Sequence, residues 1–275
     1  MKKPALLVFV ILSYCSVSNA QVQFNIQNTT SNLYNGFRSA VSWYDIPIGA
    51  AYLYRNSIRF GNGIPIKLNE LDEEISEGVS HKGTVSLGSM NKDIIPRTIF
   101  FSRLAVTTSL NLLTNAHITE NEYRKIFLFD KSLIYTYTAT EIIKNVFNRT
   151  RPDGSDNRSF ISGHTSTAFA ASTFLSLELN DFYNDWSVTR NNGFLKTGFK
   201  AVSFSILYGW AGYVGYSRIH DDKHYFTDVV GGAAVGTLIS YFIYKLNVAH
   251  GSSVFDQINI NTSGRSAQLS FAYQF

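Results

Sequence analysis

His224 and Asp228 stand four residues apart, a spacing that places two side chains on one face of a helix. A carboxylate on one imidazole nitrogen fixes the tautomer and leaves the other nitrogen free as a base or a nucleophile. Arg218 precedes the pair and offers a planar guanidinium that can hold two oxygens of an anion. His220 is also four residues from His224, which leaves a metal pair open, although the zinc-protease glutamate is missing between them.

Residues 159–165 form a second candidate segment, which opens an apolar stretch predicted to be a helix over 165–179. Ser162 can cap that helix, and Gly163 lets the backbone approach a ligand closely. The free N–H groups at a helix N-terminus can bind an anion. Taken singly, these residues are better explained as an ordinary N-cap and as a partly buried histidine near a helix start.

Lys144 and Arg151-Pro152 form the third candidate group. A spacing of seven predicts that the two cations lie on one face of a helix, two turns or about 10 Å apart. Pro152 disfavours helix at Arg151 and so predicts the helix end there. Two cations at a helix end could hold one anion, but basic residues at that place usually complement the helix dipole, as we expect for Arg149.

The elements that must position these residues are predicted helices at 99–116, 120–129, 132–146, 165–179, 200–217 and 228–246. Residues 21–95 and the linker 181–198 are polar and are expected to be irregular, with the acidic stretch 70–77 as a solvated face or a helix end. The uncharged runs at 201–217 and 229–244 are short of the about 20 residues of a membrane span, which favours a buried helical core over true spans. Gly232 and Gly236 permit close helix contact.

The two ends of the chain differ from the helical part. Lys2 and Lys3, an apolar run over 4–17 and Ser18-Asn19-Ala20 predict a secretory signal peptide, residues 1–20, with a membrane anchor or a lipoprotein signal at Cys15 as alternatives. Cys15 is the chain's single cysteine, so cleavage leaves no thiol. Alternation after residue 257 predicts a β-hairpin in 251–275, favoured as a structural tail over an outer-membrane signal.

The composition bounds the class of protein. The 275 residues suffice for one large domain or two small ones. Charged residues make up 16% against roughly 25% in ordinary domains, and aromatic residues make up 15%. These values exclude a disordered chain, a coiled coil and a collagen-like repeat. A mean hydropathy of -0.03 argues against a dense bundle of spans, and the net charge of +4 is compatible with an anionic substrate.

The three groups follow one another as Lys-x6-Arg-Pro, Ser-Gly-His and Ser-Arg-x5-His-x3-Asp. In this order and spacing the chain resembles the type 2 phosphatidic acid phosphatase and vanadium haloperoxidase superfamily. The resemblance covers residues 144–228 directly, and about 96–248 with the flanking helices. Ile161 stands where the family usually has proline, a departure that bears on the rigidity of the loop and not on side-chain chemistry.

The resemblance implies an all-α catalytic domain over 96–250, a bundle of about six helices with the site at its mouth. His224 would attack phosphorus and form a phosphohistidine, Asp228 would orient His224, and His164 would protonate the leaving oxygen. Phosphate binding falls to members of all three motifs: Lys144, Arg151, Ser162, the Gly163 N–H and Arg218. Because these cations do the work of a metal, no cofactor is implied.

The expected function is a metal-independent phosphatase acting on a phosphate monoester or pyrophosphate, with a membrane lipid as the favoured substrate. Phosphatidic acid, phosphatidylglycerophosphate, undecaprenyl pyrophosphate and lipid A phosphate are candidates by resemblance. The expected partners are this phosphorylated lipid or a small phosphate ester and a membrane surface, and not nucleic acid. The expected location is the periplasm or a membrane, the outer membrane included. A broad-specificity acid phosphatase, a vanadate-dependent haloperoxidase and an outer-membrane structural protein remain alternatives.

Overall fold

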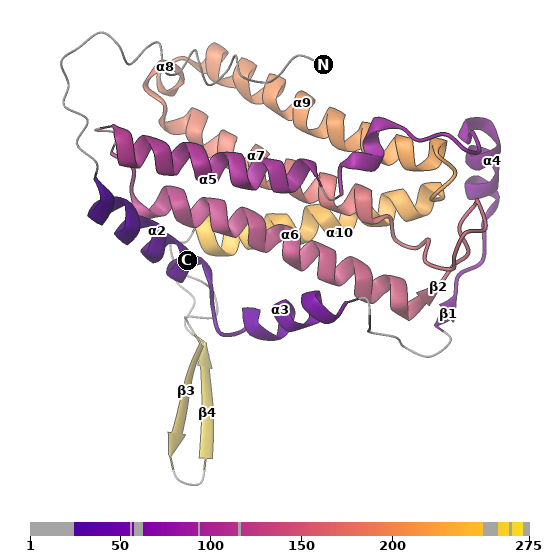
Figure 1. Ribbon diagram of the computed structural model, residues 1–275, viewed down its shortest axis with the longest axis horizontal. Helices are drawn as coiled ribbons and strands as arrows, with labels where there is room; N and C mark the ends of the chain where they lie inside the picture. The colour runs from indigo at the N-terminus through magenta and orange to yellow at the C-terminus, as the bar shows by residue number, and fades with distance from the viewer. Residues whose placement is uncertain are drawn as a thin grey trace.

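Long helices run back and forth along the longest axis of the molecule and bring the three motifs to one end of it (Figure 1). At this end α6 (Glu120–Val146) ends, α7 (Gly163–Asp185) begins, α9 (Gly193–His220) ends and α10 (Phe226–Tyr244) begins. The short helix α4 (Glu70–Val79) lies beside them (Figure 1). The all-α prediction is therefore confirmed.

This computed structural model describes residues 25–55, 57, 63–92, 94–114, 117–249, 258–263 and 266–271. The predicted signal peptide and Cys15 lie outside the described residues. At the other end of the chain, β3 (Ile258–Ser263) and β4 (Ser266–Phe271) pair antiparallel and form the predicted hairpin.

Several predicted helix boundaries differ from the structure. α5 (Ile95–Leu113) begins and ends a few residues early, and α6 is continuous where two helices were predicted. The charged residues near position 131, where a loop was predicted, lie inside α6. The helix can carry a charge there because Lys131 is buried and donates to Asp45 Oδ2 (2.9 Å) and to the Ala40 carbonyl (3.2 Å). The predicted linker 181–198 is mostly helical, because it holds the end of α7, the short α8 (Ser187–Arg190) and the start of α9. Asn192 caps α9, and its side chain accepts from the Leu195 N–H.

The prediction of an irregular segment over 21–95 is wrong for much of its length. It contains α2 (Ile26–Ala40), α3 (Asp45–Tyr54), α4 and a 3₁₀ turn, η2 (Leu87–Met90). In α4 the Asn69 side chain accepts from the Asp72 N–H (2.8 Å), and acidic residues in the first turn suit the helix dipole. The acidic stretch is thus a capped helix.

The helix before Arg151 ends at Val146, as the predicted range 132–146 has it, and not at Arg151, where Pro152 was expected to mark its end. α6 stops at Val146, and β2 (Phe147–Asn148) pairs in parallel with β1 (Ile64–Pro65). Lys144 and Arg151 therefore do not share a helix face: Lys144 is in the last turn of α6, and Arg151 is in the loop that follows. Pairing with a distant strand, and not Pro152, ends the helix.

α7 and α10 approach each other closely at the two predicted glycines. A Cβ on Gly236 would lie 2.0 Å from the Ser166 carbonyl oxygen, and one on Gly232 would lie 2.6 Å from that of Ser162. No side chain fits at either position. This contact holds the start of α10, which carries Asp228, against the start of α7, and the Ser162 N–H donates to the Asp228 carbonyl (3.0 Å).

The apolar surfaces of the long helices are only partly buried. A core between α6, α7 and α10 includes Phe129, Phe174 and Tyr244, and the helix over 226–248 is long and apolar enough to cross a membrane. Large apolar side chains are exposed on three helices: Phe101, Val106 and Leu110 of α5, Phe194, Val202, Phe204 and Ile206 of α9, and Val230, Leu238 and Phe242 of α10. The expectation that these helices form a buried core is wrong for these faces, since the apolar residues surround each helix and one side alone packs.

Candidate active site

The imidazole of His224 lies against the carboxylate of Asp228 in the turn between α9 and α10. His224 Nδ1 is 3.6 Å from Asp228 Oδ2, and the Ser159 hydroxyl lies beside both, 2.5 Å from that oxygen and 3.5 Å from Nδ1. The Tyr225 N–H also donates to Asp228 Oδ2 (2.9 Å). Since Nδ1 faces the carboxylate and the hydroxyl, Nε2 is the nitrogen left for chemistry.

Burial favours the neutral form of His224. Its side chain is 2% exposed, and this burial lowers its pKa to about 3. The positive charges of Lys144 and Arg151 lower the pKa further, whereas Asp228 opposes the shift. A neutral imidazole keeps the lone pair that a nucleophile needs at ordinary pH.

His164 occupies the first turn of α7 and is also neutral. Its Nε2 donates to the Ser89 carbonyl (2.9 Å), so the lone pair of the neutral ring is at Nδ1. Burial lowers the pKa of His164 to about 3, and the charges of Arg218 and Lys92 act in the same direction. A bound anion would offset these charges and raise that pKa, which would let Nδ1 carry a proton only when the site is occupied.

Three predicted cations surround the two histidines. Lys144 Nζ donates to the Arg158 carbonyl (2.6 Å), Arg151 Nε pairs with Asp156 (2.7 Å), and Arg218 Nη1 pairs with Asp221 (3.1 Å). Burial lowers the pKa of Lys144 to about 7, and the charge of Arg151 contributes in the same direction.

Arg218 also has donor capacity to spare. Its Nε is buried and has no hydrogen-bond partner among the described residues. A buried donor without a partner is costly, and a bound anion would satisfy it.

Ser162 is the N-cap of α7, as predicted. Its hydroxyl oxygen accepts from the Thr165 hydroxyl (2.9 Å) and from the Thr165 N–H (3.5 Å). The Ser162 hydroxyl proton can then be donated elsewhere. The first N–H groups of α7, that of Gly163 among them, have no partner within their own helix. Capping by Ser162 is therefore compatible with the anion site that was predicted at this residue.

Arg149 does more than complement the helix dipole, the role that we expected for it. It is buried (3% exposed) and its Nη1 donates to Asp228 Oδ1 (2.6 Å), while its Nη2 pairs with Asp72 of α4. Asp72 in turn accepts from the Thr227 N–H (2.9 Å) and hydroxyl (2.7 Å) at the start of α10. The predicted partner of His224 is thus held by a buried network that reaches into the N-terminal segment.

The sequence did hold one signal for Asp72. Asp72, Ile75 and Val79 are spaced to share one helix face, so an acidic side chain is aligned there with apolar ones. Asp72 is 0% exposed, whereas its neighbours Glu73 and Glu74 face solvent. The acidic stretch is therefore solvated on one side and buried on the other.

His220 does not form a metal pair with His224. Its ring stacks on His81 with centroids 4.7 Å apart, and its Nδ1 lies 3.4 Å from Asp221 Oδ1. Within the part of the chain that the structure describes, no group of three His, Cys, Asp or Glu side chains could hold a metal ion. His220 instead helps to fix the loop before α5 against the end of α9.

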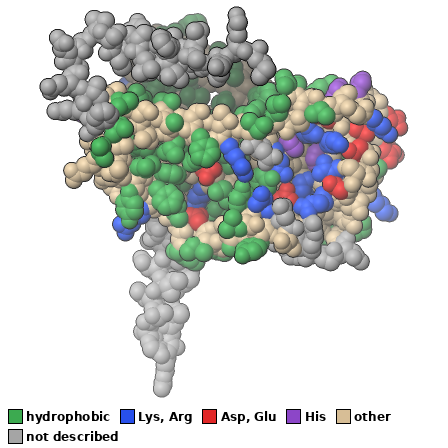
Figure 2. Space-filling model, in the orientation of Figure 1, with side chains coloured by type: hydrophobic (Ala, Val, Ile, Leu, Met, Phe, Trp, Pro, Cys, Tyr) green, Lys and Arg blue, Asp and Glu red, His purple; other side chains and the backbone are tan. Residues whose placement is uncertain are grey.

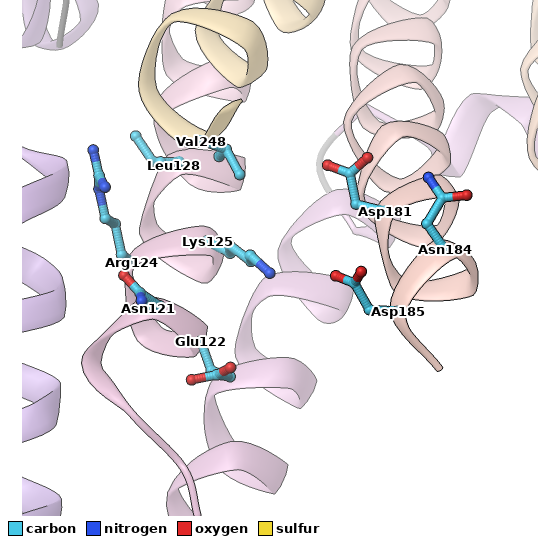
Figure 3. A pocket seen from close by; sticks show the side chains of 9 residues that line it. All are labelled: Asn121, Glu122, Arg124, Lys125, Leu128, Asp181, Asn184, Asp185 and Val248. Carbon is cyan, nitrogen blue, oxygen red and sulfur yellow. The ribbon is translucent and has the colours of Figure 1, made fainter. Parts of the chain in front are cut away.

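A cavity of about 490 Å³ lies at the other end of the long helices (Figure 3). Glu122 and Lys125 of α6 and Asp181 and Asp185 of α7 line it. Because the cavity is near the last turn of α7 and His164 is in the first, about 25–30 Å of helix separates them. Figure 2 shows charged side chains gathered toward the end that holds the motifs, with hydrophobic ones over much of the rest of that face.

Comparison with known proteins agrees with the motifs. Residues 131–251 match the family model of the PAP2 superfamily. The lipid A 1-phosphatase of Porphyromonas gingivalis is 37% identical over 104 residues, which are 38% of this chain and 20% of that protein. Lipid phosphate phosphatase 1 of Arabidopsis thaliana is 40% identical over 93 residues, 32% of this chain and 25% of that protein. The alignments thus span a fifth to a quarter of these two relatives.

Two solved structures are also similar. Aquifex aeolicus LpxE gives a TM-score of 0.40 at 19% identity, with 70% of this chain and 92% of that chain covered. The PAP2-type phosphatidylglycerolphosphate phosphatase of Bacillus subtilis gives 0.42 at 19% identity, with 90% and 96% covered. The resemblance is thus confirmed as a match: residues 131–251, which hold the three motifs, match the model of the PAP2 superfamily.

Proposed function

We propose that this chain is a phosphatase that hydrolyses a phosphate monoester or diphosphate of a membrane lipid through a phosphohistidine on His224. The observation that carries the proposal is the concentration of buried positive charge around two neutral histidines. Lys144 acts on the pKa of both histidines, Arg151 on that of His224 and Arg218 on that of His164, so each charge lies near at least one of the two rings. A phosphoryl group is the ligand that such a cluster suits.

The proposed reaction has two steps. His224 Nε2 attacks phosphorus, the bond from phosphorus to the leaving oxygen breaks, and His164 Nδ1 gives that oxygen a proton. Asp228 and Ser159 stabilise the positively charged ring that results. Water then attacks phosphorus, its proton passes to His164, the N–P bond breaks and phosphate leaves. The anionic substrate raises the pKa of His164, which is how the acid acquires its proton.

The lipid part of the proposal rests on the exposed apolar faces of α5, α9 and α10. Exposed apolar side chains in such number favour contact with a lipid surface over contact with water. Two relatives, at 37% and 40% identity over the aligned residues, are named a lipid A phosphatase and a lipid phosphate phosphatase, which favours a lipid here as well. Export to the periplasm or to a membrane follows if residues 1–20 are a signal peptide, and N-terminal sequencing that begins at Gln21 would support it.

The test is phosphate release from p-nitrophenyl phosphate and from phosphatidic acid in detergent micelles. The wild type should release phosphate in EDTA and be inhibited by vanadate, which copies the five-coordinate geometry at phosphorus. His224→Ala should abolish turnover, whereas the exposed His117→Ala should not. Radiolabelled phosphate trapped on the wild type should be stable to alkali and labile to acid, as a phosphohistidine is.

Two results would overturn the proposal. Substantial turnover by His224→Ala would exclude the covalent step on that residue. Bromide oxidation by peroxide and vanadate, without phosphate release from either substrate, would favour the haloperoxidase alternative.

A further inference from the structure

The segment between α4 and α5 packs over the start of α7, outside the residues that match the family model. Its Ser89 carbonyl accepts from His164 Nε2, and its Asn91 side chain donates to the His164 carbonyl (3.3 Å) and accepts from Trp210 (2.8 Å). A Cβ on Gly88 would lie 2.0 Å from Ser217 Oγ, so the backbone rests directly on α9. These contacts fix the position of the next residues, including Lys92.

Lys92 places a further cation beside the predicted phosphate site. Its Nζ would lie 3.7 Å from a Cβ built on Gly163, whose N–H is a predicted phosphate ligand. The charge of Lys92 lowers the pKa of His164 and also that of Lys144. The Lys92 side chain is 20% exposed, so it sits at the edge of the site and not deep within it.

A second cation, Arg55, shares an aromatic ring with Lys92. Lys92 Nζ is 4.5 Å and Arg55 Cζ is 5.0 Å from the ring centroid of Tyr137, so their separation cannot exceed the sum of these distances. Arg55 Cζ also lies 4.4 Å from the Tyr52 ring. Rings that hold cations in place pre-position them for an anion.

The acidic group nearby does not neutralise this pair. Glu141 Oε1 is 3.5 Å from Lys92 Nζ, a long contact for an ion pair, and Glu141 Oε2 is bonded closely by Arg158. One carboxylate is thus shared by two cations, and Arg55 is held by the rings and by the Tyr52 carbonyl (2.6 Å). The group keeps a net positive charge.

We propose that Lys92 and Arg55, held on Tyr137, form a second anion subsite that binds the leaving phosphate of a lipid diphosphate. The inference rests on the proposed function and deepens its substrate class. Lys92 lies beside His164, the predicted donor to the leaving oxygen, and hence on the leaving-group side. When the P–O–P bond breaks, the electron pair goes to the bridging oxygen of a lipid monophosphate, and the two cations stabilise that charge.

Comparing a diphosphate with a monophosphate of the same alcohol distinguishes this subsite from the site that binds the transferred phosphoryl group. We would measure kcat/KM of the wild type and of Lys92→Met for farnesyl diphosphate and farnesyl monophosphate in the same detergent micelles. Lys92→Met should reduce kcat/KM for the diphosphate about 10- to 100-fold more than for the monophosphate, the range for loss of one charge-assisted hydrogen bond. Lys92→Arg should restore much of the difference.

Two further variants complete the design. Lys82→Met is the matched control, since Lys82 is an exposed lysine of the same segment, and it should change neither rate. Arg55→Met should repeat the selective loss if Lys92→Met folds poorly, as judged by its melting temperature.

Equal losses on both substrates, or no loss on either, would overturn the subsite, as would a wild type that hydrolyses the monophosphate alone. A wild type that hydrolyses neither substrate would overturn the proposed function, and the subsite with it.

Discussion

Raising the pH above 7 should discharge Lys144 in the empty site and weaken substrate capture before it slows the chemical step. Burial lowers the pKa of Lys144 to about 7, and Arg151 and Lys92 act in the same direction against Glu141. An ordinary lysine keeps its proton to about pH 10. The predicted phosphate-binding ammonium is therefore a group that titrates near neutral pH.

The size of the effect follows from this pKa. Two pH units above 7, only about one enzyme in a hundred keeps the Lys144 charge, so kcat/KM should fall on the order of 100-fold between pH 6 and 9. A bound phosphoryl group favours the charged amine and raises its pKa, so kcat should fall much less over the same range. The substrate itself completes its second ionisation near pH 6 and adds little to this limb.

Initial rates with p-nitrophenyl phosphate from pH 5 to 9.5 would give both profiles. In Lys144→Arg the alkaline limb of kcat/KM should move above pH 9, because a guanidinium stays charged. Lys125→Arg, at the far end of α6, should leave the limb in place. A kcat/KM that is flat to pH 9, or a limb that Lys144→Arg does not move, would refute the assignment.

Three other predictions concern the residues around the histidines. Asp72→Asn removes a charge that Arg149 contacts but keeps an oxygen for Thr227. We expect kcat to fall on the order of 10-fold, about 1.4 kcal/mol, with KM nearly unchanged. An equal loss of kcat in the exposed Glu73→Gln would contradict this. His164→Ala should slow hydrolysis of an alkyl phosphate more than that of p-nitrophenyl phosphate, whose leaving group needs little protonation; equal slowing would argue against the acid role. Denaturant melts should show the free energy of unfolding falling from pH 6.5 to 4.5, because histidines with a folded pKa of about 3 bind fewer protons than in the unfolded chain; constant stability over that range would contradict their burial.

The sequence predicted the ends of the helices that carry the motifs better than the elements between them. Ser162 caps α7 through an oxygen that reaches only three residues along the chain, and Asp228 lies one turn from His224. Such contacts are local, so spacing alone reveals them. The prediction that Lys144 and Arg151 share a helix face was wrong because the pairing of β2 with β1, which begins directly after α6, joins residues about 80 positions apart.

The partners of the predicted residues were missed for the same physical reason. Nothing near Arg149 in the sequence indicates Asp72, and nothing near His164 indicates the Ser89 carbonyl. Each of these contacts spans about 75 residues, and each depends on how the loop before α5 and the helix α4 pack. Single-sequence patterns report which face of an element is apolar, but not which element will cover it.

This division of the site has a consequence for function. The predicted nucleophile, acid and phosphate ligands come from residues 144–228, whereas three groups that adjust them come from residues 63–92. Asp72 holds Arg149 on Asp228, Ser89 fixes the tautomer of His164, and Lys92 adds charge beside both His164 and Lys144. Because these three act on pKa, orientation and charge and not on the attacking nitrogen, changes in 63–92 should alter pH dependence and substrate range while the reaction itself persists. The proposed phosphohistidine chemistry would then depend on residues 144–228, and its pH dependence and substrate range would depend on residues 63–92.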